Sequence, residues 1–186
     1  MKSASGLFNS KLLSIEDALL HIKSNDDLII AQAASEPQGC LAKLHLIADK
    51  VENVKVFSVL LLNSYPFYET ADMKGKFEVC SWFHSAGSRR ALKNNTGTVT
   101  YVPNMLHRAG LDRMHVKKPN VFIGTCTPPD AKGYVSLSLG ITYEKDIIEN
   151  ADIVILEVNE LLPRTLGDTY WGSISRALLS TSASIW

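Results

Sequence analysis

A nearly unbroken run of β-favouring apolar residues, 54–62, places the tightest constraint on the fold of this chain. A strand this uniformly apolar is buried on both faces, as a central strand of a parallel sheet is when helices cover it. Residues 153–158 form a second run of the same kind. Two such runs predict an α/β domain in which helical layers cover both faces of one sheet.

Helical segments alternate with the strand-like runs. Ser14 is placed to cap a helix that begins at Ile15, and residues 41–51 repeat apolar side chains at helical spacing. Further strands are expected at residues 28–30, 77–83, 98–102, 120–123 and 134–139, and further helices at 85–92, 104–110 and 143–150. The alternation predicts an open, mainly parallel sheet flanked by helices.

A turn-rich segment, residues 124–140, interrupts the later part of this pattern. Its prolines fix φ, Asp130 is placed to close an Asx-turn, and Gly133 supplies a positive φ where the chain reverses. Residues 134–139 then alternate apolar side chains with serine, the period of a half-buried strand. We expect this segment to form a ledge at the edge of a ligand cleft.

Polar loops follow the predicted strands. In open α/β sheets, ligands bind outside the carboxyl ends of the strands, where such loops meet. The loops in question are residues 32–38, 63–64, 84–89, 125–133 and 159–164. We therefore expect them to form the wall of one cleft.

The charge balance argues against several partners. Nineteen basic residues cancel nineteen acidic ones, whereas nucleic acid and anionic membranes attract a basic surplus. No apolar run approaches the roughly 18 residues of a membrane span, and residues 1–11 lack the apolar core of a signal peptide. Cys40, Cys80 and Cys126 lie in apolar surroundings, which is typical of buried free thiols in a reducing cytoplasm.

Several catalytic motifs are missing from the sequence. It has no glycine-rich dinucleotide fingerprint, no phosphate-binding loop and no Gly-x-Ser-x-Gly elbow, and its histidines and cysteines lack metal-ligand spacing. Residues 85–89 could hold an anion at a helix start, although a capped helix with a solvated arginine is the favoured interpretation. Glu157 lies inside an apolar strand and requires a partner, for which a structural ion pair with Arg164 is the leading candidate.

Four ordered segments carry a resemblance to a known family: residues 81–92, 97–106, 127–137 and 151–168. With them, the chain from about Ser14 to Thr169 resembles the amino-terminal part of the acetyl-CoA hydrolase/transferase family, which includes 4-hydroxybutyrate, butyrate and succinate CoA-transferases. Residues 1–169 are therefore expected to form the α/β half of a CoA-transferase. Residues 170–186 have no recognised family counterpart and are expected to be a frameshifted or truncated end.

The resemblance implies an exchange of CoA between an acyl-CoA and a short-chain carboxylate such as acetate, butyrate, succinate or 4-hydroxybutyrate. In the family, a glutamate carries the CoA between the two acids, so the CoA thioester is a substrate and no cofactor is implied. That glutamate lies in a second α/β half, which this chain lacks. We therefore assign no catalytic residue here and expect the isolated chain to be inactive.

What the resemblance carries over is one wall of the substrate site. Two loops match family positions that face the catalytic half, and we assign them to recognition of the acyl group or carboxylate. The residues are Gln32, Glu36, Pro37 and Gln38 in the first loop and Asn63 and Ser64 in the second. Relatives commonly carry a histidine near the position of Gln32, so this chain departs from the family there.

Two alternatives remain open. The chain could be a non-catalytic subunit that pairs with a separately encoded catalytic half, as halves are divided between subunits in part of this superfamily. A sugar-phosphate isomerase of similar fold is weaker, because the scattered basic residues offer little for a phosphosugar. Under either CoA-transferase interpretation, an uncovered apolar interface predicts self-association.

Overall fold

The computed structural model describes residues 11–172 and 176–181, and it contains one eight-stranded sheet in which every strand pair is parallel. The strand order is β1-β10-β8-β6-β2-β3-β4-β5. The strands are β1 Leu12–Leu13, β2 Asp27–Ile30, β3 Val54–Ser58, β4 Phe77–Ser81, β5 Val99–Tyr101, β6 Val121–Cys126, β8 Ile153–Val158 and β10 Ala177–Thr181. The predicted open, parallel α/β sheet is confirmed.

The order of the strands creates a switch point at the centre of the sheet. From β2 the chain moves outward through β3 and β4 to β5, then returns to place β6 on the other side of β2. Loops that leave the carboxyl ends of β2 and β6 therefore diverge to opposite sides, which opens a crevice where ligands bind in such sheets.

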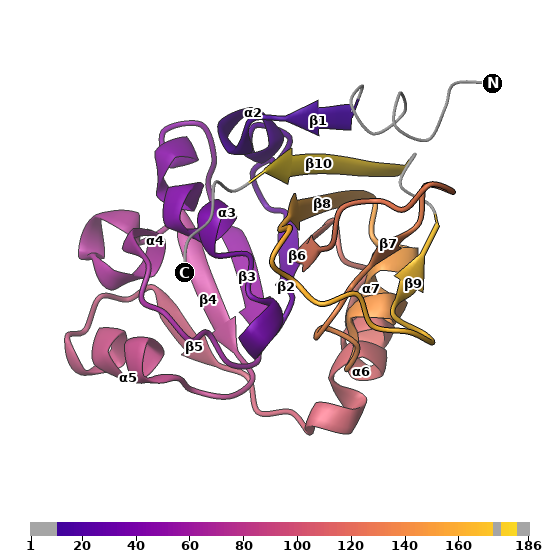
Figure 1. Ribbon diagram of the computed structural model, residues 1–186. Coiled ribbons are helices and arrows are strands. Elements are labelled where there is room, and N and C mark those ends of the chain that lie inside the picture. Colours follow the sequence, from indigo (N-terminus) through magenta and orange to yellow (C-terminus); the bar gives the residue numbers. More distant parts are fainter. Residues whose placement is uncertain (1–10, 173–175, 182–186) are drawn as a thin grey trace.

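Helices cover both faces of the sheet (Figure 1). One core contains side chains of α2 through α4 packed on β2, β3 and β4, and the other contains side chains of α6 and α7 packed on β2, β6 and β8. The helices are α2 Ile15–Leu19, α3 Gln38–Lys43, α4 Pro66–Glu69, α5 Ala86–Lys93, α6 Ala109–Val116 and α7 Glu144–Asn150, and the 3-10 helices are η1 Ala33–Ser35, η2 Leu44–Ile47, η3 Ala71–Met73 and η4 Leu106–Arg108. Among the described residues, no helix is long and apolar enough to cross a bilayer.

Local sequence signals account for several element boundaries. Ser14 caps α2, because its hydroxyl oxygen accepts a hydrogen bond from the Asp17 amide at 3.0 Å. Ser85 caps α5 in the same way, through the Ser88 amide. Residues 121–126 are all buried, as a central strand between two helical layers requires.

Several predicted elements have different bounds in the structure; the strand expected at 77–83, for example, ends at Ser81, and the strand expected at 120–123 continues to Cys126. The strand expected at residues 54–62 ends at Ser58, because the chain leaves the sheet there and residues 59–60 line a cavity. The helix expected at 104–110 begins later and continues through α6 to Val116. The strand expected at 134–139 is reduced to β7, Val135–Ser136, which pairs only with a short strand rather than with the main sheet.

The segment beyond residue 169 contributes to this architecture. β9, Tyr170–Trp171, pairs antiparallel with β7. β10 then inserts between β1 and β8 in the main sheet, with Leu179 beside Leu156 on one side and Leu12 on the other. The expected boundary at residue 169 concerns family membership, and in space the described residues on both sides of it belong to one sheet.

Candidate functional site

A cavity of about 380 Å³ lies at the carboxyl ends of β2, β3 and β4, on the side of the switch point where the chain first moves outward. Most of its wall is apolar, and two amide side chains, Gln32 and Asn104, join that wall. The lining residues are Gln32, Ala33, Val59, Leu60, Trp82, Phe83, Asn104, Leu106 and Ala109. A cavity is therefore present at the predicted edge, and only Gln32 of the predicted site residues lines it. The expectation that five loops form its wall is wrong, because residues 63–64, 84–89, 125–133 and 159–164 are not among the lining residues.

Gln32 is held in place by the opposite side of the crevice. Its backbone amide donates to the buried Glu144 carboxylate at 3.1 Å, and its side-chain nitrogen donates to the Thr142 hydroxyl. The next residue, Ala33, has a φ of 46° and donates its amide to the Leu60 carbonyl at 3.2 Å. A positive φ is costly for alanine, so tertiary contacts fix the turn that brings residues 32–33 to the cavity.

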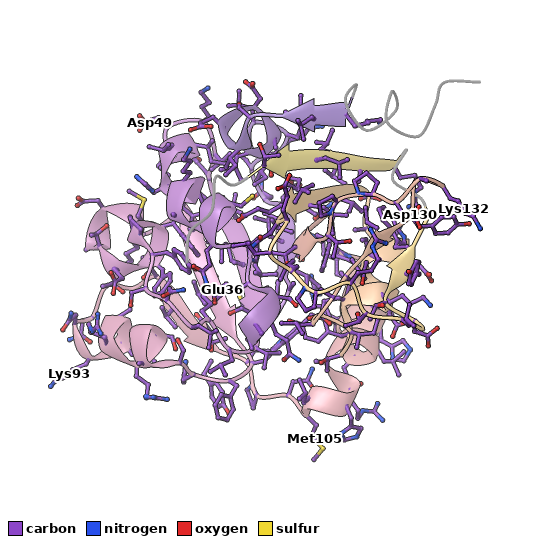
Figure 2. The ribbon with its side chains drawn as sticks, viewed as in Figure 1. Glu36, Asp49, Lys93, Met105, Asp130 and Lys132 are labelled. Carbon is purple, nitrogen blue, oxygen red and sulfur yellow. The ribbon has the colours of Figure 1, made fainter. Side chains whose placement is uncertain are left out.

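The Glu36 carboxylate is buried behind this turn and bonded to the loop after β3. Its Oε2 accepts from the Leu62 amide at 2.6 Å, and its Oε1 accepts from the Asn63 side-chain amide at 3.3 Å. The Tyr65 hydroxyl and the Asn63 backbone amide donate to the same Oε1. Figure 2 shows Glu36 inside the fold, among the strands and helices of the first half of the chain. Glu36 therefore ties the first predicted loop to the second.

The environment of Glu36 changes its protonation. Burial raises the pKa of the Glu36 carboxyl above its ordinary value of 4.5, and hydrogen bonds from Tyr65, Leu62 and Asn63 partly oppose that shift. Burial and the nearby Glu36 charge also raise the pKa of Tyr65 far above its ordinary value. A carboxyl whose oxygens are both occupied is suited to positioning a loop and poorly suited to attacking a substrate.

The remaining predicted residues separate into two groups. Asn63 is exposed and Ser64 is half-buried, and both belong to the loop that Glu36 holds. Pro37 is buried at the start of α3, and Gln38 is the first residue of that helix. The structure thus brings Glu36 and Asn63 into contact and directs Pro37 and Gln38 into the following helix.

The end of β4 and the loop after β5 supply lining residues that the sequence analysis missed: Trp82, Phe83, Asn104 and Leu106. Trp82 and Phe83 were assigned to the strand interior because the apolar run continues through them. The available signal was their place at the end of a predicted parallel strand, where side chains turn towards the crevice. Phe83 is 59% exposed and lies beyond Ser81, the last residue of β4.

The start of α5 is a capped helix, as favoured from the sequence. Ser88 donates its hydroxyl to the Ser85 carbonyl, and the Arg89 guanidinium donates to the His84 carbonyl. His84 approaches the Ser88 hydroxyl at 3.2 Å and packs on the Tyr101 ring. The polar groups at the start of α5 thus satisfy one another by hydrogen bonding. Burial, followed by the Arg89 charge, lowers the pKa of His84.

The expected ion pair between Glu157 and Arg164 is wrong. Glu157 accepts hydrogen bonds from the backbone amides of Gly39 and Cys40 at 3.2 and 2.9 Å, so the first turn of α3 supplies its partners. Arg164 donates instead to the carbonyls of Pro128 and Tyr134. Glu157 therefore fastens α3 to β8 and is not among the residues that line the cavity.

The ledge forms the turn that its sequence predicts. The Asp130 carboxylate accepts from the amides of Lys132 and Tyr134, each at 2.9 Å, and Gly133 has a φ of 87°. The Tyr134 amide, above all, holds the pKa of Asp130 below its ordinary value. Asp130 and Lys132 lie at the periphery of the molecule, well away from Glu36 (Figure 2).

A larger cavity, of about 630 Å³, lies at the opposite, amino edge of the sheet, and its lining includes Lys55, Lys74 and Glu78. Beside it, the buried Asp27 carboxylate pairs with Arg113 and, at 3.1 Å, with Lys117. The Arg113 guanidinium also lies 4.3 Å from the centre of the Phe57 ring. Within residues 11–172 and 176–181, no group of three His, Cys, Asp or Glu side chains is arranged to hold a metal ion.

The sequence pattern of the acetyl-CoA hydrolase/transferase N-terminal domain matches residues 2–172. The succinyl-CoA:acetate/propanoyl-CoA:succinate CoA transferase of Fasciola hepatica is 28% identical over 151 residues, which cover 79% of this chain and 30% of that protein. The 4-hydroxybutyrate coenzyme A transferase of Clostridium kluyveri is 26% identical over 165 residues, which cover 88% and 38%. The chain thus spans about a third of the length of these relatives.

Solved structures share the fold. The crystal structure of RipA from Yersinia pestis superposes with a TM-score of 0.86 at 24% identity, covering 97% of this chain and 44% of that one. A chain of the decarboxylase AibA/AibB superposes with a TM-score of 0.60 at 14% identity, covering 92% of this chain and 82% of that one. The matched pattern extends over nearly all of the sequence, and the chain therefore belongs to the acetyl-CoA hydrolase/transferase family as its N-terminal domain.

Proposed function

We propose that this chain forms the substrate-holding half of a CoA-transferase that exchanges CoA between an acyl-CoA and a short-chain carboxylate. The names of the relatives support this, since they describe CoA transfers to or from short acids. One observation supports a catalytic residue outside this chain. Both oxygens of Glu36, the buried acid behind the cavity, accept hydrogen bonds from the chain itself, so Glu36 is not free to act as the nucleophile. The nucleophilic glutamate then comes from a second half.

The proposed reaction proceeds in two balanced stages. The glutamate of the second half attacks the acyl-CoA carbonyl, and a mixed anhydride forms as CoA thiolate leaves. The thiolate attacks the glutamyl carbonyl, which releases the first acid and leaves a glutamyl-CoA thioester. The second acid reverses these steps and departs as its own CoA thioester. This chain contributes by binding the acyl part of each acid, with Gln32 in the cavity wall and Asn63 and Ser64 as proposed contacts from the loop after β3.

The test is CoA transfer from acetyl-CoA to butyrate or succinate, first with the purified chain alone. We expect no turnover, and turnover would overturn the division of labour. The chain is then produced together with the C-terminal half of the Clostridium kluyveri relative. We expect transfer to appear, with a glutamate–CoA thioester on the added half detected by mass spectrometry. A stable complex of the two folded chains that transfers no CoA would contradict the proposal.

The alternative, a subunit that pairs with a separately encoded catalytic half, has one specific observation in its favour. The AibA/AibB chain matches this one over 82% of its own length, so a single chain of about this size adopts the fold. The test is co-purification of a tagged chain from its native cells. A partner that itself carries CoA-transferase activity in the complex would favour this alternative, and a chain recovered without such a partner would contradict it.

A cytoplasmic location is part of the same proposal. Cys40, Cys80 and Cys126 are buried free thiols, and burial raises the pKa of both Cys80 and Cys126 to about 12. Free thiols fit a reducing compartment, where acyl-CoA is also handled. Fractionation of the native cells tests this, and recovery outside the cytoplasm would contradict it.

A further inference from the structure

We propose that the cavity at the carboxyl edge selects monocarboxylates with an uncharged, apolar acyl chain and rejects acids that carry a second carboxylate. This inference rests on the proposed function and adds the class of acid to it. Some relatives are named for succinate, a diacid, and others for the monoacids 4-hydroxybutyrate or butyrate. The inference places this chain with the second group.

The lining of the cavity carries the proposal. Its apolar wall includes Val59, Leu60, Trp82 and Phe83, and its two polar members are the amides of Gln32 and Asn104. An amide can donate a hydrogen bond to one carboxylate, but it cannot neutralise a second charge. A volume of about 380 Å³ is within the range of small-molecule sites. The cavity can therefore hold a branched or cyclic acyl chain whose far end is apolar.

The cations next to the cavity are already engaged. Arg108 adjoins the lining residue Ala109, and its guanidinium donates to both oxygens of Asp112, at 2.7 Å for the shortest contact. His84 adjoins Phe83, and burial followed by the Arg89 charge lowers the pKa of its ring, which leaves it neutral at pH 7. Arg89 itself donates to the His84 carbonyl. None of these three residues is among those that line the cavity.

The energetic consequence is large because the second charge would lose its hydration. An ionised carboxylate in an apolar site without a partner is strongly disfavoured. Sites that leave such a group unpaired discriminate far more strongly than sites that only miss a methylene. We expect a diacid to bind at least about 100-fold more weakly than the monoacid of the same carbon skeleton.

The experiment compares cyclohexanecarboxylate with cyclohexane-1,4-dicarboxylate, which share a ring and differ by one carboxylate. Each acid is titrated into the purified chain at pH 7, and binding is followed by calorimetry and by the NMR shifts of the Gln32 and Asn104 side-chain amides. We expect saturable binding of the monoacid at these amides and at least about 100-fold weaker binding of the diacid. Equal binding of the two acids, or binding of neither, would overturn the inference.

A gain-of-function variant separates charge selection from a general loss of folding. Leu106 lies at the rim of the cavity and is 49% exposed, so Leu106→Arg adds a cation with little cost to the core. We expect Leu106→Arg to reduce the ratio of the two dissociation constants, diacid over monoacid, about 10-fold, since the second carboxylate then has a counter-charge. Leu111→Arg is the matched control, because Leu111 is 50% exposed on α6 and does not line the cavity. If Leu106→Arg left the ratio of the two dissociation constants unchanged, the inference would be contradicted.

The failure of this inference is distinguishable from the failure of the proposed function. CoA transfer by the paired halves to both acids at equal rates would leave the function standing and overturn the selection. Selective binding of the monoacid by a chain whose paired halves transfer no CoA would instead overturn the function.

Discussion

The two edges of the sheet handle charge in opposite ways. At the amino edge, the buried Asp27 pairs with Arg113 and Lys117, and further charged side chains line the larger cavity. At the carboxyl edge, the smaller cavity is largely apolar, and the buried Glu36 is held by backbone amides and a phenol. At the switch point, where ligands bind in this class of sheet, the residues that line the cavity carry no charge.

The largest expected effect is at the amino edge. Asp27→Ala leaves the Arg113 guanidinium buried without its counter-charge, so we expect the free energy of unfolding to fall by about 3–5 kcal/mol. Urea denaturation measures this. Lys117→Ala is the control, because that ammonium is half-exposed, and we expect its loss to cost less than about 1 kcal/mol. If both variants lost the same free energy of unfolding, the buried Asp27–Arg113 pair would not be the main source of stability at the amino edge, which would contradict this prediction.

An intermediate effect is expected from Glu36. Glu36→Gln turns an amide NH₂ towards backbone and side-chain donors, which leaves one of them unsatisfied and lowers the free energy of unfolding by about 1–3 kcal/mol. The loss has a definite pH dependence. Because the folded-state pKa of Glu36 is raised, its contribution is fully present below the ordinary value of 4.5 and declines as pH rises through the folded pKa.

Denaturation of both proteins between pH 4 and pH 7 checks the sign of this dependence. We expect the stability difference between the wild-type chain and Glu36→Gln to be greatest at the acidic end and to shrink towards neutrality. A difference that grows with pH would show that the carboxylate is stabilised by its hydrogen bonds more than it is disfavoured by burial.

The smallest change in stability is expected at the apolar rim of the carboxyl edge, where Leu62, Phe83 and Met105 are 55%, 59% and 66% exposed. Phe83→Ser should change the free energy of unfolding by no more than about 0.5 kcal/mol, yet reduce self-association of the chain, because this rim is the surface we expect a second half to cover. Sedimentation velocity measures the association. Leu46→Ser, at a similarly exposed leucine on η2, is the matched control, and an equal reduction for both variants would contradict a role for the rim.

Most strands and helices of the sheet could be predicted from the sequence, because the signals that mark them are local. Residues 153–158 form a strand with the predicted bounds, and Ser14 caps the predicted helix. The length of β3 was overestimated, because residues 59–62 continue the apolar pattern after the chain has left the sheet. An apolar side chain that lines a cavity and one that fills a core look alike in a sequence.

The candidate site was only partly accessible, because its residues meet through tertiary contacts. Gln32 was placed correctly in the crevice by its position after a predicted strand. The bonds from Glu36 to the loop after β3 join segments that no local pattern relates. Glu157 was matched to a cation because a charge in a strand needs a partner, whereas the first turn of α3 supplies backbone amides for that purpose.

The position of β10 has a consequence for the order in which the molecule is assembled. Leu12 pairs with Leu179, more than 160 residues later in the sequence, so β1 has no neighbour in the sheet until β10 has been synthesised. Until then β8 is an unprotected sheet edge rich in isoleucine, valine and leucine, which is a hazard for aggregation during synthesis. A nascent chain released before residue 177 would keep that edge open, which makes this part of the molecule a natural place for chaperones to act.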